Sequence, residues 1–264
     1  MSSIAKATAT QPLIIAVVGR KGGAGKTTTA YNLAGALATS QRRVLLLDMD
    51  PQASLTGILL GERSDVGIGA ALLDAHATLA PLIVPIDDTL FPNTFLVPGD
   101  RGIERAAQDL SDTAMGFFRL RKLLAPLVGF DVVVIDTPPA LGFAISSALL
   151  AAHLAVLPTL TGQHDLDALG DTIALIDGQA ELGGARLAAV VPCAVHPREL
   201  HDRAALGALT AAFGDLVTPP VPYSPRVRES IIAREPIVRY DPHSPAAAAY
   251  AAVAARVMDG ASHA

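Results

Sequence analysis

A glycine-rich loop close to the N-terminus carries the strongest chemical signal in this chain. Gly25, Lys26 and Thr27 match the end of the phosphate-loop pattern G-x-x-x-x-G-K-[ST], and a short apolar strand precedes the loop. Glycines accept backbone torsions that a Cβ atom forbids, so successive N–H groups can converge on phosphate oxygens at the start of the next helix. We therefore expect a nucleotide-phosphate site built from eight consecutive residues: Lys21, Gly22, Gly23, Ala24, Gly25, Lys26, Thr27 and Thr28.

Three polar residues of this loop suit phosphate chemistry directly. The Lys26 ammonium would neutralise charge on the β and γ phosphates, the Thr27 hydroxyl would bind Mg²⁺, and Thr28 would contact the α-phosphate. A nucleotide with β and γ phosphates, bound together with Mg²⁺, is therefore the expected ligand.

Carboxylates follow two further apolar runs of the chain. Asp48 and Asp50 come at the end of the run Val44–Asp48, and Asp136 ends the run Asp131–Asp136. Open α/β sheets bind ligands beyond the carboxyl ends of their parallel strands, so we expect all three carboxylates to lie in one pocket with the glycine-rich loop. In that pocket Asp136 can hold the Mg²⁺ shell through water.

Short apolar runs alternate with stretches of helical period along the rest of the chain. This alternation predicts an α/β fold of the P-loop NTPase kind, a mostly parallel twisted sheet with helices on both faces. The expected strands are Leu13–Val18, Val44–Asp48, Thr94–Val97, Asp131–Asp136, Leu154–Pro158 and Leu187–Pro192. The expected helices are Thr27–Thr39, Gly102–Leu110, Ala114–Leu127, Ile145–Ala152, Leu166–Glu181, Arg203–Phe213 and Pro245–Met258, and a proline cluster from Pro219 to Pro225 predicts a rigid loop.

The composition indicates one compact domain. Hydrophobic residues make up 51% of the 264 residues and charged residues 17%, and no Pro-, Gly- and Ser-rich run divides the chain. We expect one domain over residues 12–259, with a flexible tail at 1–11 and a second tail at 260–264. The most apolar window, Phe143 to Leu160, contains His153 and Pro158, and predicts a helix followed by a buried strand rather than a membrane span. The apolar run at Leu13–Val18 is too short for a signal-peptide core, which predicts a cytoplasmic protein.

Together these motifs resemble the ParA family of deviant Walker ATPases, which also includes MinD and the nitrogenase iron protein. The resemblance runs from Leu13 to about Met258, and it includes the segments Pro138 to Gly142 and Val221 to Pro242. It implies that residues 12–259 form a deviant Walker ATPase domain that hydrolyses ATP to ADP and phosphate with Mg²⁺.

The resemblance also assigns roles to single residues. In this family an additional lysine, matched by Lys21, reaches across a dimer interface to the phosphates of the other subunit, which implies an ATP-dependent homodimer. Asp50 matches the residue that positions the attacking water, so the implied catalytic set is Lys21, Lys26 and Asp50. The implied Mg²⁺ site is Thr27, Asp50 and Asp136.

The nucleoside end of the site is expected in the proline-containing loop. By the same resemblance, Pro222, Ser224 and Arg226 should lie against adenine. Tyr223 and Ser224 replace an Arg-Asn pair common in chromosomal members of the family, which leaves the side-chain contacts to the base open.

The C-terminal third of the chain is nearly neutral, and all eight of its basic residues after position 185 are arginines. Arg198 occupies the place where the family has an arginine implicated in non-specific DNA binding, and Arg203 and Arg228 are further candidates for DNA contact. The first hypothesis is therefore a chromosome- or plasmid-partitioning ATPase, cytoplasmic and nucleoid-associated. Its ATP dimer would bind DNA non-specifically, and a ParB-like centromere-binding partner would stimulate hydrolysis.

Three alternatives use the same motifs. A ParA-like ATPase can position a protein cargo, and the sequence does not separate this function from DNA partitioning. A MinD-like membrane role is less favoured, because the C-terminal segment after Arg256 is not a basic amphipathic helix. Redox chemistry like that of the nitrogenase iron protein would need more cysteines than Cys193, and the spacing of His196 and His201 does not suit a metal site.

Overall fold

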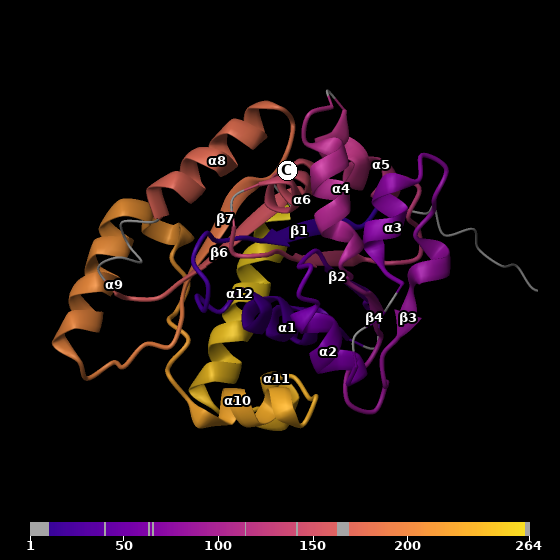
Figure 1. Cartoon of the computed structure of the whole chain (residues 1–264). Helices are drawn as coiled ribbons and strands as arrows, with labels where there is room; N and C mark the ends of the chain where they lie inside the picture. Colours follow the sequence, from indigo (N-terminus) through magenta and orange to yellow (C-terminus); the bar gives the residue numbers. More distant parts are fainter. Residues whose placement is uncertain are drawn as a thin grey trace, which may run out of the picture.

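A twisted seven-stranded sheet forms the centre of the protein. The computed structural model describes residues 11–261 except residues 40, 63, 65, 114, 141 and 163–168. The strands run in the order β3-β4-β2-β5-β1-β6-β7, and all neighbouring pairs are parallel except β3 and β4 (Figure 1). Their bounds are β1 Leu13–Val17, β2 Val44–Asp48, β3 Val84–Pro85, β4 Thr94–Val97, β5 Val132–Asp136, β6 Leu154–Thr159 and β7 Arg186–Pro192. The predicted fold class is confirmed.

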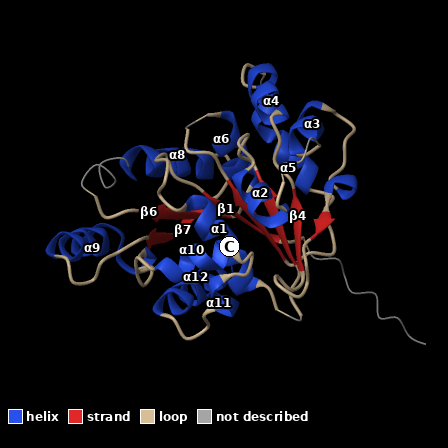
Figure 2. Ribbon diagram, turned by 60° about the horizontal axis from the view of Figure 1, so that its bottom comes forward, coloured by secondary structure: helices blue, strands red, loops and turns tan. Residues whose placement is uncertain are grey.

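Helices cover both faces of the sheet (Figures 1 and 2). One layer holds α3 (Ile68–Leu73), α4 (Gly102–Leu110), α5 (Arg119–Leu124), α6 (Phe143–Ala151) and α8 (Leu169–Glu181). The other holds α1 (Lys26–Leu37), α2 (Ser54–Leu60), α10 (Pro225–Ile232), α11 (Ile237–Tyr240) and α12 (Pro245–Ala261), and α9 (Leu200–Phe213) lies beyond the β7 edge.

Alternation along the central strands explains the two layers. In β1, Ile14 and Ala16 pack into the core under α3–α6, whereas Ile15 and Val17 pack into the core under α1 and α12. Because both faces are buried, the strand reads as a continuous apolar run rather than as an alternating one.

The six predicted strands lie within one residue of their expected bounds, but several short elements were not predicted. These are β3, α2, α3, α10 and α11. The predicted rigid loop is wrong at its end, because Pro225 is the first residue of α10, and the Ser224 hydroxyl caps this helix by accepting the Arg226 N–H at 3.2 Å.

One predicted helix also differs in the structure, and the start of another is not tested. The helix expected at Ala114–Leu127 is instead a short 3-10 turn, Gly116–Phe118, followed by α5. The backbone passes close to α4 at Gly116, where an added Cβ atom would lie 2.0 Å from the Leu110 carbonyl oxygen. The start expected for α8 at Leu166 lies outside the described residues.

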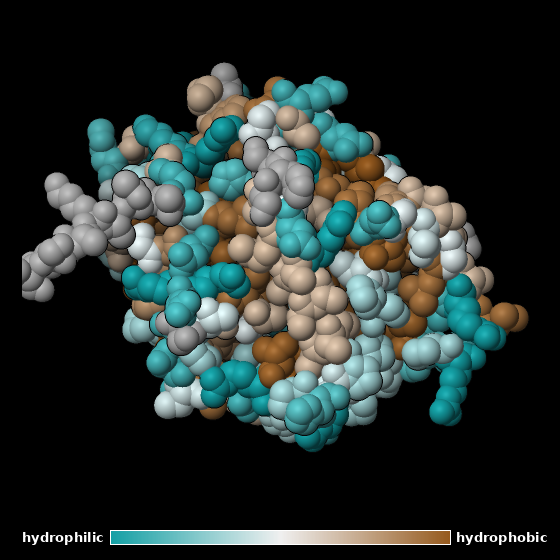
Figure 3. All heavy atoms as spheres, turned by 180° about the vertical axis from the view of Figure 1, so that it is seen from behind, coloured by the Kyte–Doolittle hydropathy of each residue, from teal (hydrophilic) through white to brown (hydrophobic). Residues whose placement is uncertain are grey.

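The window Phe143 to Leu160 is a helix and a strand, as predicted, and not one long helix. Within the described residues, no helix is both long enough and apolar enough to cross a membrane. On the face shown in Figure 3, hydrophilic and hydrophobic residues are interspersed. The C-terminal helix α12 continues to Ala261, and its apolar side packs against α1 and β7.

Candidate nucleotide site

The glycine-rich loop joins β1 to α1 and leaves the start of that helix open. Gly23 and Gly25 have φ values of 76° and 87°, in the region that favours glycine. Gly25 is also the N-cap of α1, and no side chain caps the helix. The first N–H groups of α1 are therefore available to an anion.

Lys26 is buried inside this loop. Its side chain is 6% exposed, and its Nζ donates a hydrogen bond to the Lys21 carbonyl oxygen at 2.9 Å. Burial lowers the pKa of Lys26, and the nearby Asp136 and Asp50 act in the opposite direction. The loop thus holds a cation close to two carboxylates.

A cavity of about 290 Å³ lies directly over the loop. It brings together the predicted phosphate-binding residues Lys26, Thr27 and Thr28 with Asp50, which is 9% exposed. Asp50 Oδ1 accepts the Gln52 N–H at 2.9 Å, and this bond orients the carboxylate. The remaining lining residues are Gly22, Gly23, Gly25, Ser54, Thr137 and Pro139.

Asp48 has a different role from Asp50, because hydrogen bonds within the protein use both of its oxygens. Its Oδ2 accepts the Thr56 N–H at 2.9 Å and the Thr56 hydroxyl at 2.7 Å, and its Oδ1 accepts the Asp50 N–H at 3.1 Å. Thr56 Oγ1 in turn accepts the Gly99 N–H at 2.9 Å. Burial raises the pKa of Asp48 to about 6, although these bonds oppose the shift. Asp48 therefore positions the segment that carries Asp50.

Thr56 and Gly99 are site residues that the sequence analysis missed. A Cβ atom on Gly99 would lie 2.9 Å from Asp48 Cγ, from the Asp48 carbonyl oxygen and from the Asp50 carbonyl oxygen. The one available signal was that Gly99 follows the predicted strand Thr94–Val97, at the carboxyl edge where ligands bind.

Asp136 ends β5 beside Lys26 and is completely buried. Burial and the neighbouring Asp48 raise its pKa well above the usual value. Thr27 is close enough to lower that pKa again, but neither Asp136 oxygen has a hydrogen bond of normal length and angle within the described structure. Buried carboxylate oxygens without a partner suit a Mg²⁺ ion or its water shell.

These observations fit the predicted Mg²⁺ site. Thr27 and Asp136 would hold the ion, and Asp50 lies in the same phosphate cavity. Among the described residues, no cluster of three or more His, Cys, Asp or Glu side chains could hold a metal ion by itself. Mg²⁺ often combines one or two protein oxygens with phosphate oxygens and water, so a protein-only cage is not needed.

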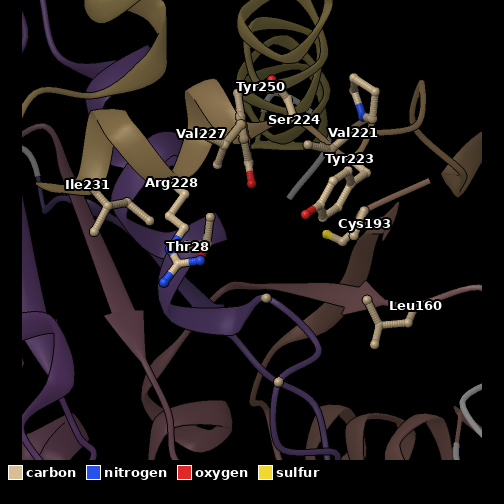
Figure 4. A pocket seen from close by; sticks show the side chains of 14 residues that line it. Thr28, Leu160, Cys193, Val221, Tyr223, Ser224, Val227, Arg228, Ile231 and Tyr250 are labelled. Atoms are coloured by element: carbon tan, nitrogen blue, oxygen red, sulfur yellow. The ribbon is translucent and has the colours of Figure 1, made fainter. Parts of the chain in front are cut away.

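A second cavity of about 280 Å³ shares Gly23, Gly25 and Thr28 with the first (Figure 4). Its wall is mostly apolar, as expected for the pocket of a nucleobase. The described lining residues beyond the loop are Leu160, Cys193, Ala194, Val221, Pro222, Tyr223, Ser224, Val227, Arg228, Ile231 and Tyr250. Pro222 and Ser224, which were predicted to lie against adenine, both line this cavity.

Arg226 does not line this cavity, although it was predicted to bind the nucleotide. Its guanidinium contacts Asp241 at 3.1 Å and Glu229 at 2.8 Å, and it lies over the Tyr240 ring. Arg228, predicted to contact DNA, lines the cavity instead.

The other two predicted DNA contacts lie elsewhere. Arg198 and Arg203 are exposed at the start of α9. The buried Asp202 holds this region, because its oxygens accept the Thr161 hydroxyl at 2.6 Å and the His196 N–H at 2.5 Å. The His196 ring stacks on Tyr223, with 4.8 Å between ring centroids, which connects the nucleoside cavity to the segment before Arg198.

Sequence comparisons identify relatives that match most of the chain. Residues 13–181 match the family described as AAA domain. The chain is 31% identical to the sporulation initiation inhibitor protein Soj of Bacillus subtilis over 249 residues, which is 92% of this chain and 97% of Soj. It is 36% identical to the chromosome partitioning protein ParA of Myxococcus xanthus over 170 residues, 64% of this chain, and the match spans 59% of that protein.

Solved structures have the same architecture. The ATP complex of McdA(D38A) from Cyanothece has a TM-score of 0.83 at 23% identity, covering 95% of this chain and 97% of McdA, which shows a shared fold. Cobyrinic acid a,c-diamide synthase from Mycobacterium smegmatis, solved with bound ADP and magnesium, has a TM-score of 0.78 at 29% identity and covers 94% of each chain.

Proposed function

Because the chain belongs to the ParA/Soj family of partitioning ATPases, we propose that it is an ATP-dependent dimeric switch that binds DNA non-specifically and segregates a chromosome or plasmid. The observation that carries this proposal is the phosphate cavity, where Lys26, Thr27 and Asp50 meet beside an unpartnered Asp136. A ParB-like partner would stimulate hydrolysis. The names of the relatives support the choice of partitioning among the uses of this fold.

In the proposed reaction the protein contributes position and charge rather than a covalent nucleophile. Lys26 and the N–H groups at the start of α1 bind the phosphates, and the Asp50 carboxylate orients the attacking water. Thr27 and Asp136 would hold Mg²⁺, which when bound would supply charge neutralisation at the phosphates. Lys21 reaches the phosphates of a second subunit, so nucleotide binding and dimer formation become one event.

The surface for DNA is the start of α9. Arg198 and Arg203 are exposed there, and Asp202 fixes the segment in which they lie. The stack of His196 on Tyr223 offers a contact path from the nucleoside cavity to Arg198. Exposed arginines on DNA phosphates give binding that weakens steeply as salt rises.

This proposal is tested by DNA binding with ATP or ADP over a range of salt concentrations. We expect binding with ATP, and we expect Arg198→Ala or Arg203→Ala to lower the slope of log affinity against log salt by about one for each arginine–phosphate interaction that the substitution removes. Arg105→Ala is the control, since Arg105 is exposed on α4 in the opposite helix layer. Absence of DNA binding at low salt, with intact ATP hydrolysis, would instead favour the positioning of a protein cargo.

A membrane-positioning role has less support. The apolar residues of α12, among them Tyr250 and Val253, are buried against α1 and β7 and are not available to a bilayer.

A further inference from the structure

Arg228 is the one charged side chain among the described residues that line the nucleoside cavity. It lies on α10, three residues after its first residue, Pro225. Thr28, at the start of α1, lines the same cavity (Figure 4). The cavity therefore holds a cation together with the end of the helix that the phosphate loop leaves open to an anion.

Arg226, two residues earlier on the same helix, has a different environment from Arg228. Residues two apart on a helix point about 200° away from each other, so the two side chains lie on opposite sides of α10. Arg226 is held by Glu229, Asp241 and the Tyr240 ring. Arg228 has no carboxylate partner within the described part of the structure, and its charge is therefore available to a ligand.

The chemistry of the cavity limits what that ligand group can be. The rest of the wall is mostly apolar and suits the base, and Thr28 belongs to both the nucleoside cavity and the phosphate cavity. The group that lies at this junction in a nucleotide is the α-phosphate, which joins ribose to the remaining phosphates. A guanidinium can bind such a phosphate through two parallel N–H donors.

We propose that Arg228 binds the α-phosphate of the nucleotide and closes the nucleoside cavity over it, so that it is a nucleotide-binding residue rather than a DNA contact. This inference rests on the proposed nucleotide function. It predicts that Arg228 strengthens binding of every adenine nucleotide alike, because all of them carry the α-phosphate. It also predicts no contribution to the binding of adenosine, which carries none.

The test measures affinities for ADP, AMP and adenosine by competition against a fluorescent ADP analogue. In Arg228→Ala we expect ADP and AMP to bind about tenfold more weakly, as for the removal of one charge-assisted hydrogen bond, with adenosine unchanged. Arg228→Lys, which keeps the charge but not the fork of donors, should recover part of the affinity. Arg105→Ala serves as the control for removing an exposed arginine.

Two results would overturn the assignment. One is unchanged ADP affinity in Arg228→Ala together with weaker DNA binding at saturating ATP, which would return Arg228 to the DNA surface. The other is an equal weakening for adenosine and ADP, which would place the contact on the base or ribose. A failure of the nucleotide-binding part of the proposed function is distinguishable, because the wild-type protein would then not bind ADP at all, and a failure of its DNA-binding part would leave the ADP affinities unaffected.

Discussion

Asp48 and Asp136 are register partners at the carboxyl ends of the neighbouring strands β2 and β5, yet only Asp48 has hydrogen-bond donors for both of its oxygens. Two buried carboxylates at equivalent positions therefore have different roles. Asp48 holds the backbone of Asp50 and Thr56 by hydrogen bonds, whereas the Asp136 oxygens remain available to a ligand.

This difference predicts different effects of removing the two carboxylates. The Asp136 oxygens accept no hydrogen bond within the described structure, although Lys26 lies nearby, so Asp136→Asn should abolish Mg²⁺-dependent hydrolysis and should destabilise the nucleotide-free protein less than Asp48→Ala does. Asp48→Ala leaves the buried donors of Thr56 unsatisfied, at a cost of about 1–3 kcal/mol of folding free energy per group. Thermal unfolding without nucleotide, together with phosphate release, checks both. A larger loss of stability in Asp136→Asn than in Asp48→Ala would contradict the assignment.

Asp50 should be needed for turnover but not for binding. Its carboxylate lies in the phosphate cavity and is oriented by the Gln52 N–H, and among the described residues it accepts no hydrogen bond from the glycine-rich loop. Asp50→Ala should therefore keep ATP affinity and lose most of the hydrolysis, whereas Lys26→Ala should lose nucleotide binding as well. Equilibrium binding and single-turnover phosphate release separate the two effects. Full turnover in Asp50→Ala would show that another group positions the water.

Lys21 should matter more to the dimer than to the monomer's nucleotide affinity. The Lys21 backbone carbonyl oxygen accepts a hydrogen bond from Lys26 Nζ within the loop. The predicted contact across the dimer interface would therefore be made by the Lys21 side chain. We expect Lys21→Ala to reduce the dimer fraction with ATP while ADP affinity changes little. Size-exclusion chromatography with light scattering measures the dimer, and Lys122→Ala on α5 controls for removing an exposed lysine. An unchanged dimer fraction in Lys21→Ala with ATP would show that Lys21 does not contribute to the interface.

The parts of the fold that could be predicted are those whose signal lies within one segment. Buried parallel strands such as β5 are continuous apolar runs, and the phosphate loop is eight adjacent residues, so both are visible in the sequence. Helices of four to eight residues, such as α3 and α11, are too short to display a helical period.

The nucleoside cavity could be predicted only in part, because its walls come from distant segments. Leu160, Cys193 and Ile231 meet there through the order of strands β6 and β7 and the packing of α10. For a related reason the sequence placed Arg226 in this cavity, whereas Arg228 lines it. Family resemblance locates the segment, but the rotation of α10 decides which arginine faces the ligand.

Gly99 provides a test of close packing behind the carboxylates. Gly99→Ala would place a Cβ atom 2.9 Å from backbone and side-chain atoms of Asp48 and Asp50, and we expect a loss of about 1–3 kcal/mol in stability together with reduced hydrolysis. Gly57→Ala is the matched control, because no atom lies within 4 Å of its added Cβ, and in α2 it should stabilise by roughly 0.5–1 kcal/mol. Chemical denaturation and phosphate release measure the pair. Equal behaviour of the two variants would argue against the close contact.

His153 should make the stability of the protein depend on pH near neutrality. Its Nδ1 accepts the Ile14 N–H at 3.0 Å, and its backbone N–H donates to the Ile14 carbonyl oxygen at 2.8 Å, so a neutral ring fastens the start of β6 to β1. Burial, and secondarily the charge of Arg121, lower the pKa of His153 from 6.5. Protonation of Nδ1 would also remove the bond from Ile14.

The sign of this effect follows from the lowered pKa. As pH falls through 6.5, the unfolded chain takes up a proton at His153 before the folded protein does, so the stabilisation present above pH 6.5 is lost on acidification. His153→Asn keeps an acceptor for Ile14 but cannot titrate. We expect the melting temperature of the wild type to fall more than that of His153→Asn between about pH 7.5 and pH 5.5, a window that brackets the ordinary histidine pKa. Other titrating groups contribute equally to both proteins, so parallel curves would show that His153 has the same pKa in the folded and unfolded states.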